Sequence, residues 1–246
     1  MNIREDLYRL FCVPKCPSCD IYLKRGEVVL CSECMSKFEG EKVHKCSFCF
    51  QEISRCSCTP KPFKNVKIRH LFKISRYFSG TEDSPTKKLI FSLKKDNLRH
   101  TVNFIANELA NRLLSHFCEN AKELIIVPIP RRRNNVIKFG YDHAYVLAKA
   151  IAKKMGCKAM MALKSCSKRD QKGLTREERA ENAKYILRPK VQISGKQILI
   201  LDDIVTTGSS MIAATKFLQK LSPKEINAAC FAVSYRDISL NITETF

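Results

Sequence analysis

The sequence has no long apolar run. None of its uninterrupted apolar stretches approaches the ~20 residues that a helix needs to cross a bilayer. Its first ten residues already include Arg4, Glu5, Asp6 and Arg9, so the chain does not open with the basic and then apolar pattern of a secretion signal. We therefore expect a cytoplasmic protein that is not inserted into the membrane.

Acidic residues are scarce beside basic ones. The chain has 44 Lys and Arg against 24 Asp and Glu, which gives a formal net charge of +20. Eight thiolates that bound two Zn²⁺ ions would lower this charge only to about +16. A field of this sign attracts polyanions and favours nucleic acid as a partner, although a solvated basic surface without such a partner is the alternative.

Cysteine is rare in most of the chain. Nine of the 13 cysteines lie between Cys12 and Cys58, and the segment 60–70 that follows them holds two prolines and a cluster of basic residues. This distribution predicts two domains, a zinc-binding cysteine module at 1–62 and a second domain at 63–246.

Eight of the N-terminal cysteines form four close pairs, and a pair of this kind can present two sulfurs to one ion. Tetrahedral Zn²⁺ needs two pairs, so we predict two structural zinc sites. Their ligands are Cys16, Cys19, Cys31, Cys34, Cys46, Cys49, Cys56 and Cys58. The sequence leaves open whether successive pairs share an ion or the pairs interleave in a cross-brace. Free buried thiols and an iron–sulfur cluster are the alternatives to zinc.

Patterns of strand and helix alternate in the second part of the chain. Ser84-Pro85 indicates the start of a helix, and a second helix is expected at 103–117 from its apolar spacing. The apolar runs 124–129, 198–201 and 226–233 read as buried strands. This alternation predicts an α/β fold, with a mostly parallel sheet flanked by helices on both faces.

The strand at 198–201 leads into Asp202-Asp203 and then into a loop of small residues that opens a helix. Vicinal carboxylates can accept hydrogen bonds from two ribose hydroxyls, and such a loop offers N–H groups, hydroxyls and the positive helix end to a phosphate. The loop consists of Thr206, Thr207, Gly208, Ser209 and Ser210. As an alternative, two Asp residues could merely end a strand and cap a helix.

Residues 198–210 resemble the signature by which type I phosphoribosyltransferases bind 5-phosphoribosyl-1-diphosphate (PRPP). The resemblance implies that Asp202 and Asp203 hold the ribose 2′- and 3′-hydroxyls. It implies also that the loop from Thr206 to Ser210 holds the 5-phosphate and that Mg²⁺ accompanies PRPP.

The four cysteine pairs ahead of such a domain are similar to the ComF family of natural-competence proteins. Further matching positions are Leu89, Ile90, Leu93, Lys94, the segment 127–131, Gln171, Leu174, Arg179 and Asn182. The resemblance implies a double zinc-ribbon module before a type I phosphoribosyltransferase domain. It also implies that the protein handles incoming single-stranded DNA during transformation, with a competence helicase as a partner.

One segment departs from the family. Where ComF proteins usually have Arg-Gly-Phe-Asn-Gln-Ala, this chain has Phe139-Gly140-Tyr141-Asp142-His143-Ala144. A carboxylate at Asp142 repels a diphosphate unless Mg²⁺ or a basic group intervenes, and Lys138 is a candidate for that group.

The run Arg131-Arg132-Arg133 follows the carboxyl end of a predicted strand, the edge where open parallel sheets bind ligands. Together with Lys138, these arginines are candidates to contact pyrophosphate or DNA. Phe139 and Tyr141 could stack on bases or belong to the core.

We therefore predict a ComF-like protein that binds PRPP and single-stranded DNA and acts in DNA uptake. The main alternative is an active phosphoribosyltransferase, which would transfer phosphoribose from PRPP to an acceptor and release pyrophosphate. No acceptor-specific residue is identifiable, so the sequence does not decide whether the protein is an enzyme. A third interpretation is a zinc protein that binds nucleic acid and whose PRPP loop is vestigial.

Overall fold

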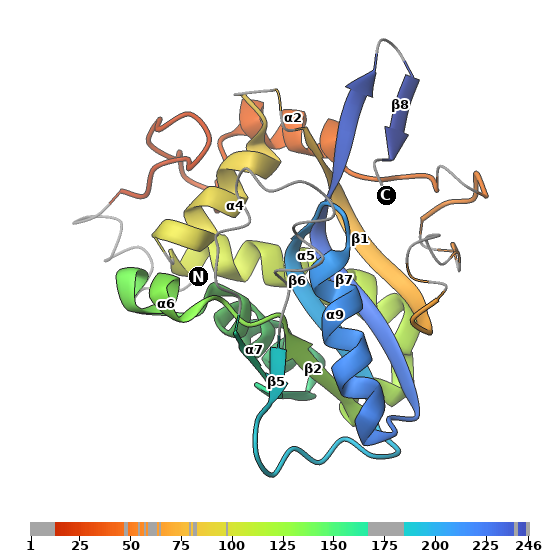
Figure 1. Cartoon of the computed structure of the whole chain (residues 1–246). Helices are drawn as coiled ribbons and strands as arrows, with labels where there is room; N and C mark the ends of the chain where they lie inside the picture. The colour runs from red at the N-terminus through yellow and green to blue at the C-terminus, as the bar shows by residue number, and fades with distance from the viewer. Residues whose placement is uncertain are drawn as a thin grey trace.

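The computed structural model describes residues 13–46, 49–53, 55–56, 58, 63, 65–78, 80, 83–96, 98–166, 185–238 and 241–244. Its centre is a parallel sheet with the strand order β1-β7-β6-β2-β3 and helices on both faces (Figure 1). The strands are β1 (Ile68–Phe78), β2 (Leu124–Pro128), β3 (Lys158–Ala159), β6 (Gln197–Val205) and β7 (Glu225–Ile238). A short strand, β8 (Asn241–Glu244), pairs antiparallel with the end of β7. The predicted α/β fold is confirmed.

Strand β6 lies at the centre of the sheet, where both of its faces are covered. Ile200 pairs with Val127 of β2 on one side and with Ala228 of β7 on the other. Because helices cover both faces of a parallel sheet, its strands are apolar without alternation. The run from Ile198 to Leu201 is accordingly fully buried.

One face of the sheet carries α4 (Pro85–Lys95), α5 (Arg99–Phe117) and α7 (His143–Met155), which share a hydrophobic cluster with Leu199 and Leu201 of β6. The other face carries α9 (Ser209–Leu218) and the hairpin of β4 (Leu163–Ser165) and β5 (Tyr185–Leu187), packed around Ile198 and Ile200. The shorter elements are α2 (Ser32–Glu41), α6 (Arg133–Phe139) and the 3₁₀ turns η1 (Cys118–Glu123) and η2 (Gln219–Leu221).

The helix boundaries follow from local capping. The side chain of Ser84 accepts a hydrogen bond from the N–H of Lys87, and Pro85 occupies the first turn of α4, as predicted. Helix α5 begins at Arg99, four residues before its predicted start. Helix α7 begins after its cap Asp142 and ends at Gly156, which has a φ of 68°.

The N-terminal part packs directly on the face of the sheet that carries α4, α5 and α7. Phe38 of α2 stacks on Phe231 of β7, with ring centroids 5.9 Å apart, and meets Phe104 of α5 edge-on at 5.4 Å. Cys16 and Leu30 belong to the same buried cluster as these helices. The two predicted parts therefore share a hydrophobic core, while the boundary between residues 62 and 63 stays a prediction.

Gln171, Leu174, Arg179 and Asn182, which match the ComF family, lie outside the described residues. Among the residues that the structure describes, no helix is long and apolar enough to cross a membrane.

Candidate functional site

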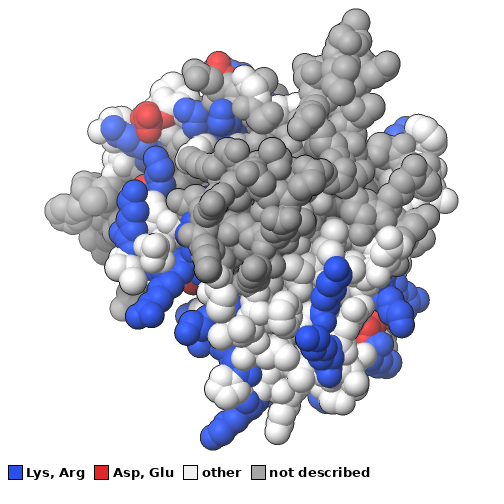
Figure 2. Space-filling view, viewed as in Figure 1, with Lys and Arg blue, Asp and Glu red and all other residues white. Residues whose placement is uncertain are grey.

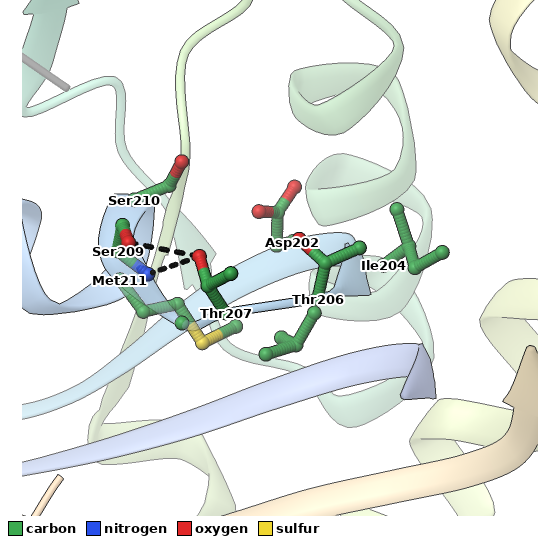
Figure 3. A pocket seen from close by; sticks show the side chains of 9 residues that line it. Asp202, Ile204, Thr206, Thr207, Ser209, Ser210 and Met211 are labelled. Carbon is green, nitrogen blue, oxygen red and sulfur yellow. Dashed lines mark hydrogen bonds between the residues drawn. The ribbon is translucent and has the colours of Figure 1, made fainter. Parts of the chain in front are cut away.

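A pocket lies where β6 ends and α9 begins, at the carboxyl edge of the sheet. Its lining runs along one stretch of chain and consists of Asp202, Ile204, Val205, Thr206, Thr207, Gly208, Ser209, Ser210 and Met211. Figure 3 shows the Asp202 carboxylate across the pocket from the hydroxyls of Ser209 and Ser210. We call this concavity the β6–α9 pocket. Six of the seven residues predicted for phosphoribose binding line this pocket, and Asp203 is the exception.

Gly208 shapes the turn that leads from the pocket into α9. It caps the helix with a φ of 73°, a left-handed conformation that glycine adopts without a steric cost. The Thr207 hydroxyl lies 2.8 Å from the Ser209 hydroxyl and accepts a bond from the Ser209 N–H at 3.4 Å. The first turn of α9 carries no acidic residue that would neutralise the positive helix end. The turn therefore presents N–H groups and hydroxyls suited to an anion.

Tyr185 of β5 supports this turn from the neighbouring hairpin. Its side chain is buried and is hydrogen bonded to Ser210, and burial raises the pKa of its hydroxyl. Sequence reasoning missed Tyr185, because only the tertiary fold brings its strand, β5, into contact with α9.

The two neighbouring aspartates of β6 have different surroundings. Asp202 is half-buried and lines the pocket, whereas Asp203 is buried and does not line it. Burial, followed by the nearby Asp203 charge, raises the pKa of Asp202 well above its usual range. The structure therefore brings the first carboxyl group, and not the second, to the loop.

Asp203 is held by two residues that the sequence analysis did not place in the site. Its Oδ2 lies 2.5 Å from the ammonium of Lys94 at the end of α4, and its Oδ1 lies 3.3 Å from Nε2 of His143 at the start of α7. Burial raises the pKa of Asp203, but the Lys94 charge and the His143 hydrogen bond outweigh burial and hold the pKa below its usual range. We call these three side chains the Asp203 triad.

The segment after β2 lies beside the pocket, because the N–H of Ile129 donates to the carbonyl of Leu201 at 2.8 Å. Arg131 and Arg132 follow in the connection, and Arg133 begins α6. Lys138 lies in the last turn of α6. The four basic residues predicted for pyrophosphate or DNA thus come from one connection and one short helix.

Asp142, the residue that departs from the ComF pattern, acts as a helix cap. Its carboxylate accepts hydrogen bonds from the N–H groups of Ala144, Tyr145 and Arg131, at 3.1, 3.3 and 2.9 Å. The Arg131 guanidinium lies over the rings of Phe139, at 4.2 Å, and Tyr141, at 5.7 Å. Arg131 therefore already occupies one face of each ring proposed to stack on bases.

The eight cysteines gather into two tetrads. The first holds Cys16, Cys19, Cys31 and Cys34, and the second Cys46, Cys49, Cys56 and Cys58; within each, the sulfurs lie within 4.8 Å of one another. The pairing is sequential, which resolves the alternative that the sequence left open in favour of successive pairs.

Sulfur separations within the tetrads fit a tetrahedral ion. The sulfurs of Cys19 and Cys31 are 3.6 Å apart and those of Cys49 and Cys56 are 3.7 Å apart. Four sulfurs at about 2.3 Å from a tetrahedral Zn²⁺ would be about 3.8 Å from one another. Burial and the neighbouring thiols raise the pKa of Cys34 to about 12, so a bound cation would favour the ionised form of this thiol.

The two tetrads begin with the same structural unit, 30 positions apart. The N–H of Cys16 donates to the carbonyl of Ile21 at 2.8 Å, and that of Cys46 donates to Gln51 at 2.9 Å. In each tetrad this turn brings both cysteines of the first pair to the same group of sulfurs, as the spacing of the pairs predicts. Among the described residues, His44 is not part of either tetrad; its Nε2 contacts the carbonyl of Glu39 at 3.2 Å.

The chain belongs to the phosphoribosyl transferase domain family, whose pattern matches residues 96–239. It is similar to competence protein ComFC of Streptococcus pneumoniae, with 24% identity over 212 residues, which cover 84% of this chain and 88% of that protein. The resemblance to the ComF family is thus confirmed over most of the chain.

A shorter similarity links the chain to ribose-phosphate pyrophosphokinase of Pyrococcus abyssi, with 41% identity over 51 residues, or 20% of this chain and 18% of that enzyme. Among solved structures, purine phosphoribosyltransferase from Pyrococcus horikoshii matches 54% of this chain and 73% of its own, with 20% identity and a TM-score of 0.36. Hypoxanthine-guanine phosphoribosyltransferase from Bacillus anthracis matches 59% and 78%, with 14% identity and a TM-score of 0.39.

Proposed function

We propose that this protein binds PRPP together with Mg²⁺ and acts as a ComF-like protein in DNA uptake. The observation that carries the proposal is the β6–α9 pocket, in which an uncompensated helix N-terminus, four hydroxyl-bearing side chains and one carboxyl group line a single concavity. The competence role is supported by the similarity to ComFC of Streptococcus pneumoniae, which covers 84% of this chain.

Each part of PRPP has a counterpart in the pocket or beside it. The turn from Thr206 to Ser210 would receive the 5-phosphate, and Asp202 would accept a hydrogen bond from a ribose hydroxyl. The connection around Arg131, which lies beside β6, would face the diphosphate and its Mg²⁺. Two structural Zn²⁺ ions would occupy the cysteine tetrads, where four thiolates match the preference of zinc.

The PRPP proposal predicts that PRPP with Mg²⁺ raises the melting temperature, because a ligand selective for the native state stabilises it. Asp202→Asn should weaken PRPP binding about tenfold or more, since it removes a charged acceptor. Glu33→Gln, a change of equal charge at an exposed position of α2, is the matched control. Differential scanning fluorimetry and calorimetric titration would measure both effects. Equal affinities for the wild type and the Asp202 variant would place PRPP outside this pocket.

We further propose that single-stranded DNA binds the basic surface around α6. Figure 2 shows Lys and Arg side chains spread over one face of the protein with few acidic atoms among them, in keeping with the net charge of +20. Arg133 and Lys138 are exposed on α6, and Lys138 also lies over the Phe139 ring at 5.4 Å, whereas the half-buried Arg131 contacts both Phe139 and Tyr141. These exposed cations are therefore better placed than Arg131 to reach phosphates.

Affinity for single-stranded DNA should fall steeply with salt, with a slope of about −0.7 per neutralised phosphate. The double change Arg133→Ala with Lys138→Ala should flatten this slope by about 1.4, whereas Lys158→Ala, at an exposed site on β3, should leave it unchanged. Fluorescence anisotropy across a salt series is the measurement. An unaltered slope in the double variant would exclude α6 as the DNA surface.

A further inference from the structure

Asp202 and Asp203 are adjacent on a strand, so their side chains leave β6 in opposite directions. Asp202 turns to the face of α9 and lines the pocket. Asp203 turns to the face of α4 and α7, where only 3% of its surface is exposed. A ligand that occupies the β6–α9 pocket can therefore contact the carboxyl group of Asp202 directly, whereas that of Asp203 lies on the other face of the strand.

Both oxygens of Asp203 are already engaged. Lys94 forms an ion pair with Oδ2 at 2.5 Å, and His143 contacts Oδ1 at 3.3 Å. A ribose hydroxyl that bound Asp203 would have to reach the opposite face of β6, where these two partners already contact the carboxylate. The arrangement therefore favours a fixed structural role for this carboxylate.

The imidazole of His143 fits the role of a neutral donor. Its Nδ1 is buried and has no hydrogen-bond partner among the described residues, so a proton on that nitrogen would be unsatisfied. The ring is therefore assigned as the tautomer that donates its Nε2–H to Asp203. Glutamine, the usual ComF residue at this position, can offer an amide N–H for the same bond.

The Asp203 triad also reaches the connection beside the pocket. The Tyr141 hydroxyl donates to the carbonyl of Leu93, next to Lys94, at 3.1 Å. The Arg131 guanidinium in turn donates to the carbonyl of Tyr141 at 3.4 Å. One continuous set of contacts thus joins β6, the end of α4, the start of α7 and the connection that follows β2.

We propose that the two aspartates have separate roles: Asp202 contacts the ribose, and Asp203 is a positioning residue that Lys94 and His143 hold so that β6 presents Asp202 and the loop correctly. This inference rests on the proposed function, because it names the part of that site that touches the sugar. It differs from the role that the family resemblance implies, in which both carboxylates hold ribose hydroxyls.

The test compares ribose 5-phosphate with its 2-deoxy and 3-deoxy forms by calorimetric titration. The wild type should prefer ribose 5-phosphate over at least one deoxy form by about tenfold, the value of one hydrogen bond to a charged group. Asp202→Asn should abolish this preference. Asp203→Asn should lower the affinity for all three ligands by a similar factor and keep the preference, because Asp202 would still bind the hydroxyl. Loss of the preference in Asp203→Asn would overturn the proposal.

The melting temperatures of Lys94 and Asp203 variants provide a second test that does not need a ligand. Lys94→Met and Asp203→Asn should each lower the melting temperature, and the double variant should lose less than the sum of the two shifts. Additive shifts would overturn the positioning role.

His143→Gln should retain the affinity for ribose 5-phosphate, whereas His143→Ala should lower it without a change in the preference. If the wild type bound no phosphorylated ribose, the proposed function and the ribose role of Asp202 would both fail, and the thermal cycle would still decide the role of Asp203.

Discussion

Asp202 and Asp203 are covalent neighbours whose carboxyl groups are shifted in opposite directions. The pKa of Asp203 is held below its usual range, so its ionised form stabilises the fold above pH ~4, and that stabilisation is lost as the pH falls through the folded-state pKa. The pKa of Asp202 is raised, so its ionisation costs stability as the pH rises above ~4 toward the folded-state value. The proposed ribose contact thus lies next to the residue proposed to position it.

The two corresponding amide variants should therefore move the melting temperature in opposite directions at pH 7. Asp203→Asn should lower it by several degrees, because it leaves the partly exposed Lys94 ammonium beside a neutral group, at a cost of about 1–3 kcal/mol. Asp202→Asn should raise it, because the unfavourable charge is removed. Both differences should shrink below pH ~4. Thermal melts between pH 3 and 8 would measure the shifts, and shifts of equal sign would contradict the assigned environments.

At the scale of the element, helix α9 depends on the left-handed conformation of Gly208 for its entry angle. Gly208→Ala should cost about 1–2 kcal/mol, because an L-residue is strained there, and should also displace the N–H groups that face the pocket. Gly195 is the matched control, since it has a φ of 66° in an exposed turn with open space around it. Gly195→Ala should lose similar stability and keep the affinity for PRPP. Equal affinity losses in the two variants would assign the effect to stability alone.

Most of these elements could be predicted from local patterns. The Ser84-Pro85 start of α4 and the apolar runs of β2, β6 and β7 depend on neighbouring residues, and the structure confirms them. Because successive side chains of a strand point to opposite faces, the position of Asp202 and Asp203 in a strand also predicts that they diverge, whereas the family resemblance implies that both hold the ribose. The sequence did not predict that Lys94 and His143 contact Asp203, because only the tertiary fold brings them to it from 109 and 60 positions away. The sequential pairing of the cysteines likewise depends on the fold.

For the whole molecule, α4 connects the first cysteine tetrad with the β6–α9 pocket. Cys34 belongs to α2, and Glu41 at the other end of α2 accepts a hydrogen bond from the N–H of Thr86 in the first turn of α4, at 2.9 Å. The opposite end of α4 carries Lys94, which pairs with Asp203. A change in the tetrad can therefore reach β6 through two helices.

We accordingly expect metal loss to weaken PRPP binding. The wild type should contain about two Zn²⁺ ions per chain and Cys34→Ser about one, since the tetrads are separate. The variant should also melt at a lower temperature and bind PRPP more weakly, whereas Cys166→Ser, a change at an exposed thiol outside the tetrads, should do neither. Elemental analysis with calorimetry would test this. Normal PRPP affinity in a Cys34 variant that has lost one ion would show that the tetrad and the pocket are independent.

The position of β7 in the sheet has a consequence for the order in which the chain folds during synthesis. Strand β1 pairs in parallel only with β7 among the described strands, and the Phe38 ring stacks on Phe231 of that same strand. Neither N-terminal element can therefore form its contacts with β7 until more than 150 further residues have been synthesised. Early binding of metal by the cysteine tetrads would fold the N-terminal segment before β7 has been synthesised. Depletion of zinc during translation should then reduce the yield of folded protein more than removal of zinc from the finished protein.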